Sequence, residues 1–124
     1  MLGDKDAIAT IPVKDLAVAE QFYRKTLGLT PLGSEEEGVS RFKSGDSDVV
    51  VYASQYAGTN QATTATWVVD DVEELVRDLK ARGVTFEHYD LPGLTVKDDV
   101  HVAGDFRAAW FKDPDGNILH IVGH

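Results

Sequence analysis

One pattern occurs twice in this chain of 124 residues, and the repeat restricts the possible folds more than any other feature. Residues 13–16 (Val-Lys-Asp-Leu) recur 56 positions later as residues 69–72 (Val-Asp-Asp-Val). Residues 41–43 (Arg-Phe-Lys) recur 69 positions later as residues 110–112 (Trp-Phe-Lys). Two copies are too few, and the period is too long, for a solenoid. We therefore expect two similar units that share a core in one pseudo-symmetric body.

The first unit is predicted to be a strand, a helix and three further strands. An apolar run at residues 7–13 indicates a strand. Asp15 suits the N-cap of a helix, and apolar residues at helical spacing continue to Leu27 before Gly28 ends the helix. Short strands are predicted at residues 29–32, 39–43 and 48–53.

The second unit begins in the same way. A strand from residue 62 to residue 70 precedes Asp71, an N-cap whose capping box Glu74 completes, and the helix ends at Gly83. A further strand is predicted at residues 84–89, and the last two strands form a hairpin near the C-terminus. The order of elements is therefore βαβββ in both units.

An insertion distinguishes the two copies, because the second is 13 residues longer than the first. The extra length lies between Tyr89 and Phe106, where we expect a loop or an extended hairpin. Asp98 and Asp99 are among its carboxylates, and Tyr89 and His101 also belong to it. The insertion is either an acidic, mobile rim of a site or a solvated surface loop.

The hairpin near the C-terminus has a defined turn. Asp113, Pro114, Asp115 and Gly116 suit a type I turn followed by a residue with positive φ. If Asp113 pairs with Asn117, then Trp110 faces His120 on one side of the sheet and Phe111 faces Leu119 on the other.

These elements predict an α+β fold in which two pseudo-symmetric βαβββ modules form a cupped mixed sheet around a cleft. We expect a single domain over residues 1–124, with modules at about 5–55 and 62–124 and a linker at about 54–61. Several strands are apolar on both faces, so helices should cover one side of the sheet. The other side should line an interior cleft between the two sheets.

Composition excludes several classes of function. The chain has no cysteine, which rules out disulfides and thiolate chemistry, and its formal net charge is −9. That charge disfavours nucleic acid or an anionic membrane as a partner and is compatible with a cationic ligand. No apolar run is long enough for a membrane span, and no secretory signal is recognisable, so we expect a cytoplasmic protein.

Five short segments resemble the vicinal oxygen chelate superfamily, which includes glyoxalase I, extradiol dioxygenases and the fosfomycin- and bleomycin-resistance proteins. The resemblance rests on residues 11–16 before residues 22–23 and 27–29, then on residues 67–72, then on residues 109–117. It implies paired βαβββ modules, a cupped sheet around a cavity, and usually a homodimer.

In the metal-dependent members of that superfamily, four strand positions supply the ligands. By local pattern the resemblance places these positions at Ile8, Val51, Thr64 and His120, and the repeat offsets relate them in pairs (8 + 56 = 64; 51 + 69 = 120). Only His120 binds a divalent metal well, so we expect no metal and no other cofactor. A divalent metal held by His101 or Glu87 together with His120 is the alternative.

Strand alternation from His120 predicts the cleft lining. The expected ligand-binding residues are Trp110, His120, Arg41, Phe106, Thr64, Thr66, Thr10 and Val51. Each has a structural alternative: His120 as an interior histidine bonded to a threonine, Trp110 as core, and Arg41 in an ion pair. Trp67 is predicted on the opposite face, packed against a helix.

The chain most resembles the bleomycin-resistance branch, which implies a binding protein without a catalytic metal. Such a protein sequesters a bulky aromatic or cationic compound in a cleft formed with a second subunit. The alternative is an enzyme: a metal-dependent lyase or dioxygenase with atypical ligands, or a metal-free isomerase in which His120 is the acid–base group. A third possibility is an interaction module whose cleft is filled by its own side chains. No catalytic residue is assigned beyond His120.

Overall fold

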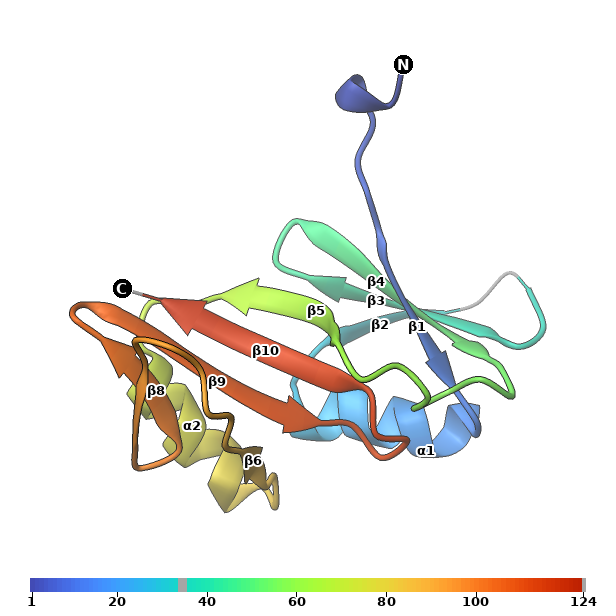
Figure 1. Ribbon diagram of the computed structural model, residues 1–124. Coiled ribbons are helices and arrows are strands. Elements are labelled where there is room, and N and C mark those ends of the chain that lie inside the picture. Colours follow the sequence, from blue (N-terminus) through green and yellow to red (C-terminus); the bar gives the residue numbers. More distant parts are fainter. Residues whose placement is uncertain (34–35, 124) are drawn as a thin grey trace.

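A computed structural model describes residues 1–33 and 36–123. After a short 3-10 turn η1 (Leu2–Asp4), the first module forms a four-stranded sheet in the order β1-β4-β3-β2, with β1 and β4 parallel (Figure 1). Its elements are β1 (Ala9–Val13), α1 (Leu16–Glu20), the π-helical segment η2 (Gln21–Thr26), β2 (Thr30–Gly33), β3 (Val39–Ser44) and β4 (Ser47–Ala53).

The second module repeats this arrangement in a six-stranded sheet, with β10 between β5 and β9 and parallel to β5. Its elements are β5 (Thr63–Val68), α2 (Val72–Ala81), β6 (Phe86–Glu87), β7 (Thr95–Lys97), β8 (Val100–Ala103), β9 (Phe106–Lys112) and β10 (Ile118–Gly123). Both β6 and β8 pair with β9. The α+β class and the two modules are thus confirmed, and the insertion is an extended hairpin made of β7 and β8.

Local sequence explains where the helices begin. The Asp15 carboxylate accepts hydrogen bonds from the backbone amides of Ala17 and Val18, and the Asp71 carboxylate accepts one from Glu74. Both N-caps were predicted, since a carboxylate satisfies amides that lack a helical partner. None of the helices in residues 1–33 and 36–123 is long and apolar enough to cross a membrane.

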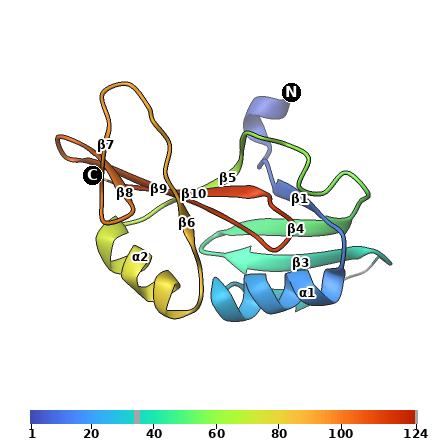
Figure 2. The same cartoon turned by 60° about the horizontal axis from the view of Figure 1, so that its bottom comes forward.

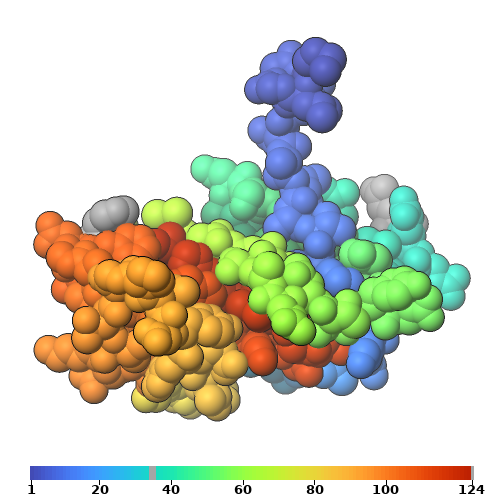
Figure 3. All heavy atoms as spheres, in the orientation of Figure 1, coloured from blue at the N-terminus to red at the C-terminus, as the bar shows by residue number. Residues whose placement is uncertain are grey.

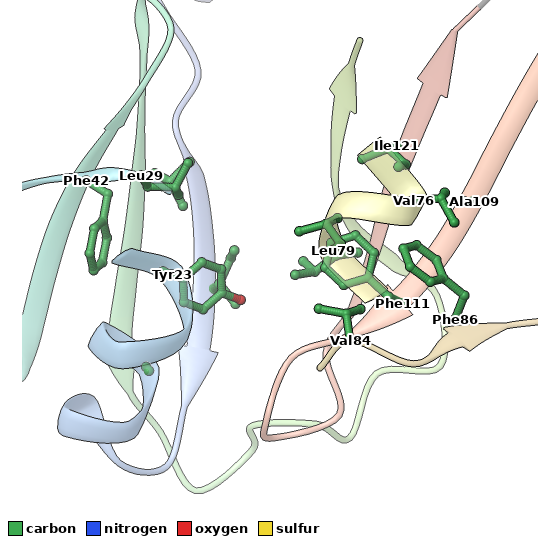
Figure 4. Packing of buried hydrophobic residues seen from close by; sticks show 14 of the residues in the cluster. Tyr23, Leu29, Phe42, Val76, Leu79, Val84, Phe86, Ala109, Phe111 and Ile121 are labelled. Atoms are coloured by element: carbon green, nitrogen blue, oxygen red, sulfur yellow. The ribbon is translucent and has the colours of Figure 1, made fainter. Parts of the chain in front are cut away.

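The two helices lie on the same side of the two sheets, which stand next to each other (Figures 1 and 2). One buried apolar cluster joins the modules: Tyr23 and Phe42 come from the first, and Val76 and Phe111 from the second (Figure 4). Within residues 1–33 and 36–123, no helix lies over the opposite face of either sheet; we call these two faces the uncovered faces. The N-terminal arm, residues 1–8, projects from the body, with Leu2 80% exposed (Figure 3).

The C-terminal hairpin is confirmed with its predicted register. Asp113 donates its backbone amide to the carbonyl of Asn117, Phe111 pairs with Leu119, and Trp110 pairs with His120. The loop also reaches the first module, because Tyr23 Oη donates to Asp113 Oδ2 at 2.7 Å. The hairpin loop therefore connects the two modules through a buried hydrogen bond, in addition to forming the turn.

The prediction that Val51 of β4 faces the cleft is wrong, because its side chain lies in the core. Phe42 pairs with Val49 in the first module, and Phe111 pairs with Leu119 in the second. The offset between copies is therefore 69 for β3 and β9 (42 + 69 = 111) but 70 for β4 and β10 (49 + 70 = 119), because the second hairpin loop is one residue longer. Since side chains alternate along a strand, this single residue exchanges the faces of β4: Val49 and Val51, predicted to face the cleft, point to the core instead. Val51 and Val49 lie in the buried core, and Val50 is the counterpart of His120.

Candidate functional site

Four rings meet on the uncovered face of the second sheet. Trp110 on β9 stacks on His120 of β10, with ring centroids 4.5 Å apart and planes at 13°. His101 on β8 meets the indole edge-on at 4.8 Å and 84°, and Tyr89, which follows β6, does so at 5.4 Å and 76°. The pairing of Trp110 with His120, and of His101 with Ala108, places these side chains together. We call this group the Trp110–His120 cluster.

Threonines of the neighbouring strand β5 hold two of these rings. His120 Nδ1 lies 3.1 Å from Thr66 Oγ1, and Trp110 Nε1 donates to Thr63 Oγ1 at 3.2 Å. The Nε2 atom of His101 accepts the backbone amide of Tyr89 at 2.9 Å. The rings of Trp110, His120 and His101 are therefore oriented by hydrogen bonds, as a recognition surface needs.

Several polar atoms of this face are buried without a partner. Among the described residues, Thr64 Oγ1, Tyr89 Oη, His101 Nδ1 and His120 Nε2 have no hydrogen-bond partner. A hydrogen bond with the backbone of Ala108 also influences the pKa of His101. Thr64 Oγ1, Tyr89 Oη and His120 Nε2 are therefore the clearer examples of buried atoms without a partner. A buried polar atom left unsatisfied costs about 1–3 kcal/mol. A bound ligand or ordered water on this face would remove that cost.

Burial keeps the two imidazoles neutral. It lowers the pKa of His120, which the charge of His101 lowers further, and it is also the main cause that lowers the pKa of His101. Burial raises the pKa of the Tyr89 hydroxyl, and the nearby carboxylate of Glu87 adds to this effect. At neutral pH the cluster therefore offers uncharged rings, an imidazole lone pair and hydroxyl groups.

The free energy of unfolding should fall in mild acid. Below pH 6.5 the unfolded chain takes up protons at His101 and His120 that the folded chain resists, so stability is lost as the pH drops toward the lowered folded-state pKa values. Each imidazole contributes a slope of about 1.4 kcal/mol per pH unit within that window. Urea unfolding between pH 7.5 and 5 measures this slope, which should be smaller in His120→Gln. Equal slopes in both proteins would contradict the assignment.

Other predicted residues lie on the uncovered face of the first sheet. Thr10 and Arg41 line a cavity of about 370 Å³ there, together with Glu36, Val39, Val50 and Tyr52. Arg41 Nη2 also pairs with Asp48 Oδ2 at 2.7 Å, so the ion-pair alternative is realised. All residues that line this cavity belong to the first module. The structure therefore does not bring Arg41 and Trp110 into one cleft within a single chain.

The remaining predictions divide between the two faces of the second sheet. Thr64, Thr66 and Phe106 lie on the same face as Trp110 by strand alternation. Trp67 lies on the helix side, as predicted, and its Nε1 donates to Ser44 Oγ at 2.8 Å. Tyr89 and His101 were not among the predicted ligand-binding residues, although both were placed in the insertion and His101 was named as an alternative metal ligand with His120. The alternation of His101 with the apolar Val100 and Val102 is the sequence signal by which it could have been placed on one face of a strand.

The residues at the expected metal positions do not fit a divalent cation. With the corrected register these positions are Ile8, Val50, Thr64 and His120, which offer one imidazole and one hydroxyl. In residues 1–33 and 36–123, no three His, Cys, Asp or Glu side chains converge as ligands. For the alternative set, His101 Nε2 already accepts an amide, and Glu87 Oε1 lies 3.4 Å from Lys112 Nζ. The side chains that the structure describes at these positions thus do not assemble the three ligands and free position of a catalytic site.

Two βαβββ modules with paired mixed sheets define the vicinal oxygen chelate class of folds. The chain belongs to the Glyoxalase/Bleomycin resistance protein/Dioxygenase superfamily, whose match covers residues 6–121. No curated protein matches.

Solved structures share the fold at low sequence identity. TnmS3, an antibiotic-binding protein from Streptomyces sp. CB03234, is 22% identical with a TM-score of 0.67, over 94% of this chain and 92% of that one. Lactoylglutathione lyase from Agrobacterium tumefaciens is 20% identical with a TM-score of 0.71, over 97% and 93%. The fosfomycin resistance protein FosX from Listeria monocytogenes is 16% identical with a TM-score of 0.74, over 98% and 93%.

Proposed function

We propose that this protein binds a bulky aromatic, preferably cationic compound on the Trp110–His120 cluster and sequesters it without a catalytic metal. The observation that carries the proposal is the set of buried polar atoms without partners around a fixed stack of rings. Aromatic surface supplies affinity, and a few polar groups orient a ligand, in most small-molecule sites.

Charge and kinship support the same proposal. The chain carries a net charge of −9, and Glu87 is paired with Trp110 across strands β6 and β9. A cation over an aromatic face is stabilised by the ring, and the carboxylate of Glu87, although it also pairs with Lys112, adds to the attraction. One structural relative is described as an antibiotic-binding protein, and the superfamily name includes bleomycin resistance.

The proposal includes a homodimer in which a second copy completes the cleft. In one chain the uncovered faces are open, with Val68 82% exposed beside the cluster, and the Arg41 cavity belongs to the other sheet. An exposed apolar sheet face is stabilised by covering it. Sedimentation equilibrium at micromolar concentration should give twice the monomer mass. A strictly monomeric protein would contradict the dimer.

Removing the indole of Trp110 should weaken binding strongly. In a thermal-shift screen of aromatic antibiotics that includes bleomycin, the wild-type protein should be stabilised by at least one cationic member. Trp110→Ala should weaken that binding by about 100-fold or more, since an aromatic anchor contributes several kcal/mol. Trp67→Phe is the matched control: it leaves Trp110 as the single tryptophan, and its fluorescence should still respond to the compound.

Two results would overturn this function. Binding that is lost in Trp67→Phe but kept in Trp110→Ala would show that the helix side, rather than the uncovered face, is the site. Elemental analysis is the test of the metal-free part: the protein as purified should carry no stoichiometric divalent metal. A tightly bound metal that is lost in His120→Ala would favour the metal-dependent lyase or dioxygenase alternative.

A second candidate, a metal-free isomerase, has one observation in its favour. His120 Nε2 has no partner among the described residues, and burial lowers the pKa of this imidazole, so it is neutral and able to accept a proton. An enzyme of this kind would turn over its compound and lose turnover in His120→Ala while still binding it. A binding protein would return the compound unchanged.

A further inference from the structure

A second cavity, of about 510 Å³, lies between α2 and the β7–β8 hairpin. Val76 of α2 and Val100 of β8, each only 2% exposed, form apolar parts of its lining together with Val102. Alternation along β8 puts Val100 and Val102 on the opposite face from His101. The cavity and the Trp110–His120 cluster are therefore on opposite sides of one sheet, and the inference below does not rest on the proposed function.

The charge around this cavity is opposite to that of the whole protein. Its lining has two carboxylates, Glu73 and Asp98, but four cationic side chains, which are Arg77, Lys80, Lys97 and Arg107. The chain has only 12 lysines and arginines, and its net charge is −9. One third of its cations thus surround one cavity, where they raise the local concentration of anions.

Two of these cations are already paired and two are available. Lys80 Nζ lies 2.6 Å from Asp99 Oδ2, and Arg107 Nε donates to Glu73 Oε1 at 2.7 Å. Arg77 and Lys97 form no hydrogen bond or ion pair with the part of the chain that the structure describes. They stand on two different elements, α2 and β7, on either side of the cavity, and both are free to bind an anion.

The hairpin that closes the cavity is held in a costly conformation. Asp98 and Asp99 form its turn with φ of 50° and 71°, a region where residues other than glycine are strained. The turn carries the Asp99 carboxylate to Lys80 of α2 and to His88, whose Nε2 is 2.6 Å from Asp99 Oδ1. These two contacts fasten the hairpin beside the helix. Strain retained in this way is typical of functional loops.

We propose that this cavity binds a small organic anion, a carboxylate or phosphate monoester attached to an apolar or aromatic body. Arg77 and Lys97 contact the anionic group. Arg107, although paired with Glu73, adds to the positive charge beside it. Val76, Val100 and Val102 contact the apolar body, whose burial provides the rest of the affinity. The volume is in the range of small-molecule sites. The β7–β8 hairpin belongs to the insertion, the part of the second module that makes it longer than the first.

Titration with three naphthalene compounds tests the proposal on the full chain. With 2-naphthoate and 2-naphthyl phosphate we expect one-site binding with Kd below about 1 mM. The amide signals of residues 76–80, 97–102 and 107 should shift in nitrogen–proton correlation spectra. Neutral 2-naphthol should bind at least about tenfold more weakly, because it has no charge for Arg77 and Lys97. Inorganic phosphate should also bind more weakly, because it has no apolar body.

The double variant Arg77→Gln with Lys97→Gln should weaken binding of the two anions by about tenfold or more. Its matched control is Arg24→Gln with Lys25→Gln, the same charge change on exposed residues of η2, which should leave Kd within about twofold. Equal weakening in both double variants would reduce the effect to general electrostatics and overturn the proposal. Signal shifts confined to Thr66, Trp110 and His120, or naphthol binding as tightly as the anions, would overturn it as well.

Discussion

Gly58→Ala should destabilise the protein by about 4 kcal/mol or more, at the upper end of single substitutions. A Cβ on Gly58 would lie 1.8 Å from the backbone oxygen of Asp115 and 3.0 Å from its carbonyl carbon. The neighbouring atoms belong to the backbone of the C-terminal hairpin loop, so no side chain can turn aside. The φ of 73° at Gly58 adds the strain of an L residue in the left-handed region.

Gly93→Ala separates these two costs. Gly93 has a φ of 79°, close to that of Gly58, but a Cβ there would meet no atom within 4 Å. Its replacement should cost only about 1–2 kcal/mol, the conformational part alone. Urea unfolding of both variants measures the difference, which we assign to the close approach of linker and hairpin. Equal losses in the two variants would show that this approach does not matter.

The elements that the sequence predicts correctly are those whose signals are local. Asp15 and Asp71 cap helices because a carboxylate satisfies the first free amides, whatever the surroundings. The register of Trp110 with His120 follows from the turn at residues 113–117, because turn length determines pairing in a hairpin. These signals lie within a few residues of the structures they determine.

The wrong prediction for Val51 results from a difference of one residue between the two hairpin loops. The repeat offset measured on β3 and β9 does not hold for β4 and β10. The reason is that the β9–β10 loop is one residue longer than the β3–β4 loop. A hydrophobicity pattern could not reveal this, since Val49, Val50 and Val51 are alike. The buried Val51 and the half-buried Val50 differ only in the face that the register assigns to them.

The separation of the two uncovered faces also exceeded what the sequence could predict. It depends on the packing of the modules through their helix sides, where Tyr23 and Phe111 belong to one cluster and Trp67 reaches Ser44. Contacts between residues so far apart in sequence leave no local pattern. The same holds for Tyr89 and His101, which the β6–β9 and β8–β9 pairings respectively bring beside Trp110.

Asn117→Asp should also be among the most destabilising substitutions, although it changes neither shape nor volume. Asn117 is 1% exposed, and its Nδ2 donates to the carbonyl of Pro12 at 2.7 Å and to Asp113 Oδ2 at 2.8 Å. A carboxylate oxygen in place of this amide would face two acceptors and leave a buried charge without compensation. We expect a loss of about 3–5 kcal/mol at pH 7.

The pH dependence of this variant identifies the cause. A buried carboxyl beside Asp113 should have a pKa raised above its unfolded value, because the charged form is disfavoured twice. The unfolded chain then releases its proton first, so the free energy of unfolding of Asn117→Asp should fall further below wild type as the pH rises from about 4 to 7. The matched control is Asn60→Asp on the exposed linker, where Oδ1 only accepts the amide of Ala62, and stability should change by less than about 0.5 kcal/mol. If the loss of stability in Asn117→Asp did not depend on pH, the buried charge would not be its cause. The hydrogen bond that Asn117 Nδ2 donates to β1 would then not have the role assigned to it.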